Sequence, residues 1–251
     1  MKKPIRFALL IAALGLFIGS AAAEELSKHV IDSRIVRVKL DGVIDLKLRQ
    51  GSEPSLQISG DKRYVDRVQV VQNGDTLLLE TESKGVKWSR SSVRAELVLP
   101  KLKEVVSEGV GTTDVSGFSG DDLEITLDGA GSMKVVCDYR HMKASLGGVG
   151  SMHLWVGENE SVDLDLQGAG YVTLGGRSKM LKASLGGLGG LNAQQFQADS
   201  VDVDLSGLGN ATVNARTNAN LNLSGLGSVI VYGKPLNRNV SVDGLGKVSW
   251  K

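Results

Sequence analysis

Residues 201–213 read VDVDLSGLGNATV, in which apolar and polar residues alternate on both sides of a Gly-Leu-Gly triplet. Alternation with a period of two is typical of β-strands, and the glycines mark a turn between two of them. We interpret Val201, Val203 and Leu205 as inward residues, followed by a step of three to Leu208 and another to Ala211. This interpretation predicts a strand, a corner and a second strand, with Leu208 pointing into the core.

The Gly-x-Gly triplet recurs at steps of 18 to 20 residues, beginning at Gly109, Gly129, Gly148, Gly168, Gly187, Gly207, Gly225 and Gly244. A period this regular predicts a solenoid, in which each coil stacks on the one before it. The residue between the two glycines is always Val, Ala or Leu, and we predict that it points inward at every corner. Glycines suit a corner where coils stack about 4.8 Å apart, because a β-carbon would be costly there. The predicted fold class is all-β, a parallel β-solenoid with coils of about 19–20 residues.

Outward residues show a longer period of 39 residues, which is two coils. The sequence KASLGG recurs at 143–148 and 182–187, and SVDLDL at 161–166 returns as SVDVDL at 200–205. With the coils in register, one outward row is predicted to run Glu124, Lys143, Asp163, Lys182, Asp202 and Asn220. Opposite charges then face each other on neighbouring coils, which stabilises the register by roughly 0.2–1 kcal/mol per pair.

The first 23 residues are typical of a cleavable signal peptide, with Lys2, Lys3 and Arg6 before the apolar run 7–18 and small residues up to Ala23. We therefore expect export to the periplasm or the extracellular space, with cleavage near Ala23. No later apolar run approaches the roughly 18 residues of a membrane span, so we expect no integral membrane segment after signal removal. The expected organisation is one solenoid domain over 24–251, with N-terminal strands and a cap at 24–100 and the Gly-x-Gly coils at 101–251.

Composition argues against several functions. Without the signal peptide the chain keeps 26 basic residues against 28 acidic ones, and this near-neutral balance predicts no nucleic-acid partner. Cys137 is the only cysteine, so no intramolecular disulfide can form, and its inward position predicts a buried apolar role.

Motifs for a metal or a nucleotide are also missing from the sequence. His29, His141 and His153 have no metal-ligand spacing, and the Gly-x-Gly triplets lack the third glycine and helix of a nucleotide loop. We predict no cofactor, no metal and no catalytic residues.

Several segments together resemble one family of secreted bacterial proteins, the putative auto-transporter adhesin head family, also called the GIN domain. They are the block 40–53, the turn 72–77, the segment Leu97–Leu102 before the first triplet, and the serial Gly-x-Gly coils. The resemblance covers about Ile35 to Lys251. It implies a right-handed, single-stranded parallel β-helix and an adhesin-like role, and it implies no functional residue.

Exposed aromatic side chains are the candidates for ligand binding. The coil offsets place His153 and Trp155 on the outside, near outward Val136 on the preceding coil, and Tyr171 follows a triplet on the next. An exposed tryptophan can stack on a sugar ring or anchor a protein, and the alternative is partial shielding by a neighbouring loop. The acid-free basic stretch from Lys84 to Arg94 could meet an anionic envelope polymer, or could be a solvated hairpin tip.

The leading functional hypothesis is a non-enzymatic, secreted β-solenoid whose surface binds an envelope or extracellular ligand, a glycan or a protein. The alternative is a periplasmic structural or regulatory protein that acts through a protein partner. A polysaccharide lyase or hydrolase is a third class, because other right-handed β-helices carry such activities, but it would need carboxylates gathered in a groove. Open coil ends also allow a homo-oligomer unless they are capped.

Overall fold

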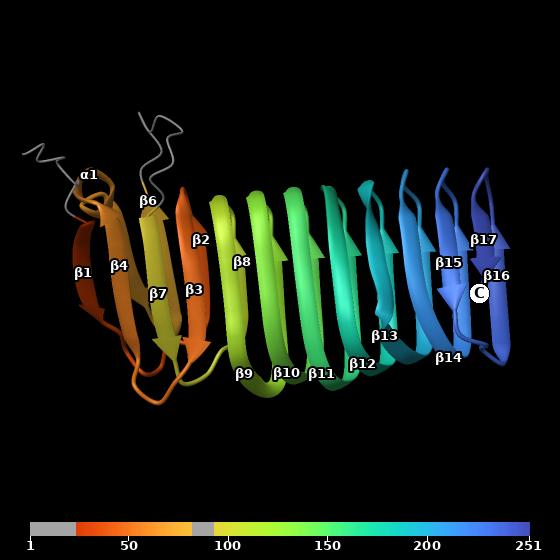
Figure 1. Cartoon of the computed structure of the whole chain (residues 1–251), viewed down its shortest axis with the longest axis horizontal. Coiled ribbons are helices and arrows are strands. Elements are labelled where there is room, and N and C mark those ends of the chain that lie inside the picture. Colours follow the sequence, from red (N-terminus) through yellow and green to blue (C-terminus); the bar gives the residue numbers. More distant parts are fainter. Residues whose placement is uncertain (1–23, 82–92) are drawn as a thin grey trace, which may run out of the picture.

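The computed structural model describes residues 24–81 and 93–251. Within them the protein is nearly all β, and parallel coils stack into a β-solenoid of about seven turns (Figure 1). All the strands belong to one hydrogen-bonded 17-stranded sheet that winds along the solenoid.

The elements of the N-terminal part are β1 (Glu24–Val30), β2 (Arg37–Asp41), β3 (Ile44–Gln50), β4 (Ser55–Asp61), α1 (Lys62–Val65), β5 (Val68–Asn73), β6 (Thr76–Thr81), β7 (Val93–Leu99) and β8 (Glu104–Ser107). The coils that follow are β9 (Val110–Leu127), β10 (Ala130–Leu146), β11 (Val149–Leu166), β12 (Ala169–Leu185), β13 (Leu188–Leu205) and β14 (Asn210–Leu223). The C-terminal coils comprise β15 (Ser228–Tyr232), β16 (Asn237–Val242) and β17 (Lys247–Trp250). The side chain of Asp61 caps α1 by accepting a hydrogen bond from the backbone amide of Arg63.

From β9 to β13 each coil is one long curved strand of 17 or 18 residues, paired in parallel with the coils on both sides. Ala130 faces Val149 at one end of the β10–β11 pairing, and Leu146 faces Leu166 at the other. The register shifts in the middle of the pairing, between Cys137 and His141. This shift marks a second bend, so each coil has two straight segments that enclose the core.

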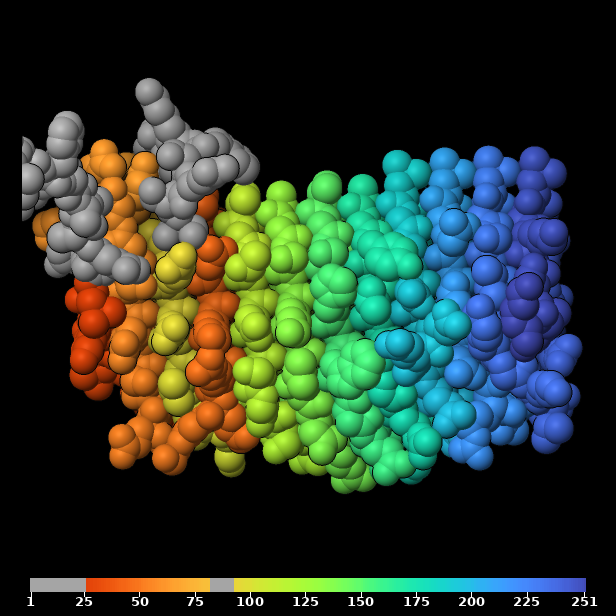
Figure 2. Space-filling view, in the orientation of Figure 1, coloured from red at the N-terminus to blue at the C-terminus, as the bar shows by residue number. Residues whose placement is uncertain are grey.

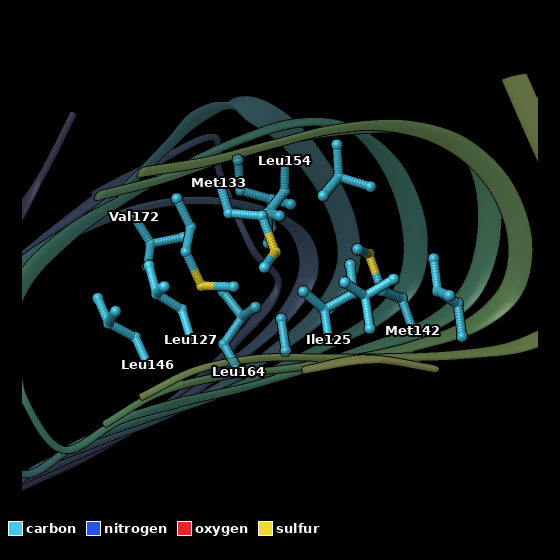
Figure 3. Close-up of a cluster of buried hydrophobic side chains, with 14 of the residues drawn as sticks. Ile125, Leu127, Met133, Met142, Leu146, Leu154, Leu164 and Val172 are labelled. Atoms are coloured by element: carbon cyan, nitrogen blue, oxygen red, sulfur yellow. The ribbon is translucent and has the colours of Figure 1, made fainter. Parts of the chain in front are cut away.

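The core is filled from the two straight segments of each coil. Figure 3 shows Met133, Leu154 and Val172 on one wall, facing Ile125, Leu127, Leu146 and Leu164 on the other, and all of them are buried. Cys137 is buried as well, as predicted from its inward position. Burying an aliphatic side chain of this size contributes about 1.5–3 kcal/mol, so repetition of this layer is the main source of stability.

The prediction that the residue inside each triplet points into the core is wrong. Val149, Leu188, Leu208, Leu226 and Leu245 are 54–83% exposed, and Ala130 and Ala169 are exposed too. The period of two in fact runs through the corner without interruption. Leu205, Gly207, Gly209 and Ala211 take the inward positions, and Leu208 takes an outward one. A β-carbon at Gly207 or Gly209 would collide with backbone atoms of the preceding coil, so only glycine fits these inward positions.

The corner glycines are required by close approach rather than by backbone conformation. A β-carbon added at Gly187 would collide with the carbonyl oxygens of Gly168 and Gln167 on the coil before, and the same holds from Gly129 to Gly225. Among the triplet glycines, only Gly111 and Gly244 have a left-handed φ. A second contact explains the inward direction, because a β-carbon at Gly227 would also meet the side chain of the core residue Leu205.

The predicted charge row is confirmed. Each residue of the row is the register partner of the next one on the neighbouring coil. The row runs Glu124, Lys143, Asp163, Lys182, Asp202 and Asn220. The Lys143 ammonium lies 2.9 Å from the Glu124 carboxylate. Toward the N-terminus the alternation is broken once, where Glu104 is in register with Glu124, and Arg37 then lies 2.6 Å from Glu104.

The N-terminal strands stack out of chain order. β3 lies between β7 and β9 and is parallel to both, and β2 lies between β6 and β8. Beyond β7 come β4 and then β1, each antiparallel to its neighbour, so the end of the solenoid is built from antiparallel strands (Figure 1). Over the described residues, no helix has the length and apolarity to cross a membrane.

Candidate functional site

The candidate surface lies on the straight segment that follows the Gly-x-Gly corner, on the outward side of β10, β11 and β12. Val136, Trp155 and Gly175 are register partners on these three coils, and they form one row across the strands. Trp155 is 51% exposed and Val136 is 40% exposed. The outward positions predicted for both residues, and for His153, are confirmed.

A second row lies beside the first one, two positions back along each strand. It consists of Lys134, His153 and Thr173, which are also register partners. These three side chains, together with Val136 and Trp155, line a shallow hollow of about 320 Å³. The surface of this hollow is mainly apolar, with the Trp155 indole as its aromatic wall.

Trp155 and Val136 also line a larger hollow of about 510 Å³, toward the second bend of the coil. Polar groups enter it from Ser119 and Asp138, and its floor includes Gly117 and Gly157. The Trp155 side chain thus lines both depressions, of which this second one is the more polar. Sequence reasoning missed this second hollow, since it depends on how the register shifts after Val136.

Tyr171 is not part of this site. Its register partners are Ser151 and Gly190, it lies next to the Gly-x-Gly corner, and it lines neither hollow. It is nonetheless 48% exposed. The structure therefore brings His153 and Trp155 together and leaves Tyr171 apart from them.

The arrangement around Trp155 suits a polar ligand with an apolar face, such as a sugar ring. The indole offers a flat apolar surface, and Ser119 and Asp138 offer hydrogen-bonding groups on one side of it. The site is open and shallow, which favours a repeating polymer over a small molecule that must be enclosed.

A second polar row lies on the opposite wall of the coils. Asp122, His141 and Ser161 are register partners on β9, β10 and β11, and His141 Nδ1 lies 2.9 Å from Ser161 Oγ. They line a groove of about 330 Å³ beside the charge row. Steps of 19 and 20 residues between the three positions were visible in the sequence, but the coil register was needed to bring them together. The groove is dominated by paired charges, among them Lys143 and Glu124, so we interpret it as part of that ladder.

Other reactive groups have structural surroundings. Burial raises the pKa of the Cys137 thiol to about 12, with a smaller contribution from the nearby Asp138 charge, so the thiol stays protonated at neutral pH. Burial also raises the pKa of the Tyr139 hydroxyl, which donates to the Leu102 carbonyl at 2.7 Å. No group of three or more His, Cys, Asp or Glu side chains positioned for a metal ion occurs within residues 24–81 and 93–251.

Two predicted features fall outside the described residues. They are the signal peptide at 1–23 and most of the basic stretch from Lys84 to Arg94. Of that stretch, Arg94 is described, and it belongs to β7, in register with Asp45 and Ser59.

Comparison with known proteins identifies both a family and a set of similar structures. A family model described as "Putative auto-transporter adhesin, head GIN domain" matches residues 36–235. No curated protein matches the chain.

Three solved structures have the same fold. A putative adhesin from Parabacteroides distasonis has a TM-score of 0.82 at 20% identity, over 92% of this chain and 98% of that one. A putative adhesin from Bacteroides fragilis has a TM-score of 0.69 at 21% identity, over 91% and 97%. A putative lipid binding protein, also from Parabacteroides distasonis, has a TM-score of 0.76 at 18% identity, over 91% and 97%.

Proposed function

Since the chain belongs to the putative auto-transporter adhesin head family, we propose that it is an exported, non-enzymatic adhesin-type module that binds a glycan through the surface around Trp155. In this proposal residues 24–251 form a single solenoid domain, released from a signal peptide by cleavage near Ala23. His153 and Lys134 contribute hydrogen bonds to the ligand, and Tyr171 does not take part.

The observation that carries the proposal is the position of Trp155 between two hollows, a mainly apolar one beside Lys134 and His153 and a more polar one that contains Asp138. Its indole is half exposed on a rigid parallel sheet, with its register fixed by coils on both sides. A large aromatic group held in place loses little conformational entropy on binding, which favours its use as an anchor.

The lining of the two hollows favours binding over hydrolysis. Asp138 is the one carboxylate among the residues that line them, whereas most glycoside hydrolases use a pair of carboxyl groups about 5–9.5 Å apart.

A binding screen against envelope and extracellular polysaccharides tests the proposal, followed by titration with soluble fragments of any polymer that binds. We expect Trp155→Ala to weaken binding by at least about 10-fold, as expected for loss of a stacking aromatic. Tyr171→Ala is the matched control, because it removes an aromatic side chain of similar exposure from the same wall but outside both hollows.

The outcomes separate clearly. Loss of binding in Trp155→Ala with retention in Tyr171→Ala, at unchanged thermal stability, supports the proposal. Binding that survives Trp155→Ala places the ligand elsewhere, and an absence of binding to every polysaccharide overturns the glycan hypothesis.

A further inference from the structure

A narrow apolar ridge runs along the Gly-x-Gly edge of the solenoid. We define the corner ridge as the outward residues at the centres of the triplets on six successive coils, Val149, Ala169, Leu188, Leu208, Leu226 and Leu245. In Figure 1 the bends before β14, β15 and β17 lie along the upper edge, and Figure 2 shows side chains projecting there. Five of the six ridge residues are more than half exposed, and Val149, Ala169 and Leu188 are register partners on successive coils.

The spacing of the ridge is fixed by backbone hydrogen bonds. The amides of Val149, Ala169, Leu188 and Leu208 each donate to the carbonyl of the first glycine on the preceding coil, at 3.1–3.2 Å. These four ridge residues are therefore held one strand spacing apart, about 4.8 Å. On the last two coils the amides of Ser228 and Lys247, two residues after the ridge, donate to Gly209 and Gly227 of the preceding coil at 3.1 Å. A rigid and regular row of this kind matches best a surface that has the same spacing.

The residues beside the ridge are small or uncharged. Two positions before the ridge residues, from the coil of Val149 to that of Leu226, stand Gly147, Gln167, Gly186, Ser206 and Ser224. Two positions after them stand Ser151, Tyr171, Gly190, Asn210 and Ser228. Small flanks allow close approach, and the absence of charge from these ten positions offers no attraction to an anionic or cationic surface.

Tyr171 strengthens the ridge where it is weakest. It flanks Ala169, the smallest ridge residue, and its ring lies over the backbone of Gly190 on the next coil. The exposed aromatic that does not belong to the Trp155 site thus adds apolar surface to this edge.

Charges appear only at the C-terminal end of the ridge, one of each sign. Asp243 precedes Leu245 by two positions and Lys247 follows it by two, so they flank the ridge on opposite sides, and both are exposed. A two-fold axis parallel to the solenoid sets the preceding flank of one copy against the following flank of the other. Asp243 of each copy then faces Lys247 of its partner. An antiparallel pairing of the two ridges would instead set Asp243 against Gly147 and Lys247 against Ser151, where no opposite charge lies.

We propose that the corner ridge is a self-association surface, on which a second copy of this chain packs its own ridge in a parallel, two-fold symmetric dimer. A second copy has the same strand spacing and the same uncharged flanks. Its Lys247 also offers a charge opposite to that of Asp243. The ridge is one residue wide, so the contact is small and the dimer is weak and depends on concentration.

Sedimentation velocity of the purified protein over a concentration series tests this inference. We expect a reversible monomer–dimer equilibrium, and the double variant Leu208→Gln/Leu226→Gln should raise its dissociation constant at least about 100-fold through loss of two buried leucine contacts. Leu236→Gln is the control, since Leu236 is 83% exposed but lies outside the ridge.

Charge exchange tests the symmetry of the dimer. Asp243→Lys should weaken the dimer, because two lysines then face each other, and Asp243→Lys combined with Lys247→Asp should restore it. A monomer at every concentration, or a dimer unaffected by Leu208→Gln/Leu226→Gln, overturns the inference. Failure to rescue by the combined exchange overturns the parallel arrangement. The dimer does not depend on Trp155, so Trp155→Ala should leave the equilibrium unchanged.

Discussion

The indole ring of Trp155 lies over Gly175, its register partner on the next coil. A β-carbon added at Gly175 would collide with three atoms of the six-membered ring, and Gly175 is buried beneath it. The ring is therefore held by a neighbour that has no side chain, and this contact fixes which indole surface remains open to a ligand.

Gly175→Ala should change binding without unfolding the protein. The added methyl group meets the end of an exposed side chain, which can move, so we expect the free energy of unfolding to fall by less than about 1 kcal/mol. The ring must tilt, and glycan affinity should fall about as much as in a conservative Trp155→Phe variant. Titration and thermal unfolding of the same samples measure both effects, and unchanged affinity would show that ring orientation is unimportant.

Gly187→Ala, in contrast, should strongly lower the free energy of unfolding. Its methyl group would meet backbone carbonyl oxygens of the preceding coil, which cannot move without separating two coils. We expect the free energy of unfolding to fall by about 3 kcal/mol. Urea denaturation checks this value, with Gly175→Ala as the matched glycine substitution. A small effect at Gly187 would mean that the corners are more tolerant than their close contact indicates.

Lys182→Glu should destabilise the solenoid through charge alone. The new carboxylate would lie between Asp163 and Asp202, so two favourable neighbours become unfavourable. We expect a loss of about 1 kcal/mol at low ionic strength and a smaller loss in 1 M NaCl, where screening is strong. Lys101→Glu, at an exposed position before the first coil, is the control. Equal effects of the two variants would contradict a role for the row.

Cys137 should make stability sensitive to alkaline pH. Burial raises its pKa from 9.0 to about 12 in the folded protein, so the protonated thiol is favoured by folding. This contribution is complete below pH 9, where the thiol is protonated in both states, and it is lost as the pH rises toward 12. Urea denaturation above pH 9 should show a steeper fall for the wild type than for Cys137→Ala. The native thiol should also resist alkylation at pH 8 until the protein unfolds.

Much of the fold could be predicted from periodicity. The 39-residue shift between 143–148 and 182–187 predicted which charges would be neighbours, because outward residues repeat with the coil register. The direction of Leu208 was predicted wrongly, because its apolar character was given more weight than strict alternation. Glycine has no side chain to mark an inward position, so the pattern looked broken at the corner where it was continuous.

The site was only partly predictable. Parity alone placed Trp155 and His153 outside, since each lies an odd number of residues from inward Leu154 or Val156. The separation of Tyr171 from them required the pairing of Trp155 with Gly175, which no local pattern contains. The pairing of β3 with both β7 and β9 could not be predicted either. It joins segments about 50 and 65 residues apart, and no repeat or motif in these segments indicates which strands are neighbours.

The enclosed position of β3 gives assembly of this solenoid a direction. Both edges of β3 are occupied, by β7 and by β9, and antiparallel β4 and β1 cover the outer side of β7. The successive parallel coils are therefore added on the other side, where β9 pairs with β10 and each later coil with the next. Once the N-terminal block has formed it acts as a seed, and each new coil is templated by the one before it, in the order in which the chain emerges during synthesis.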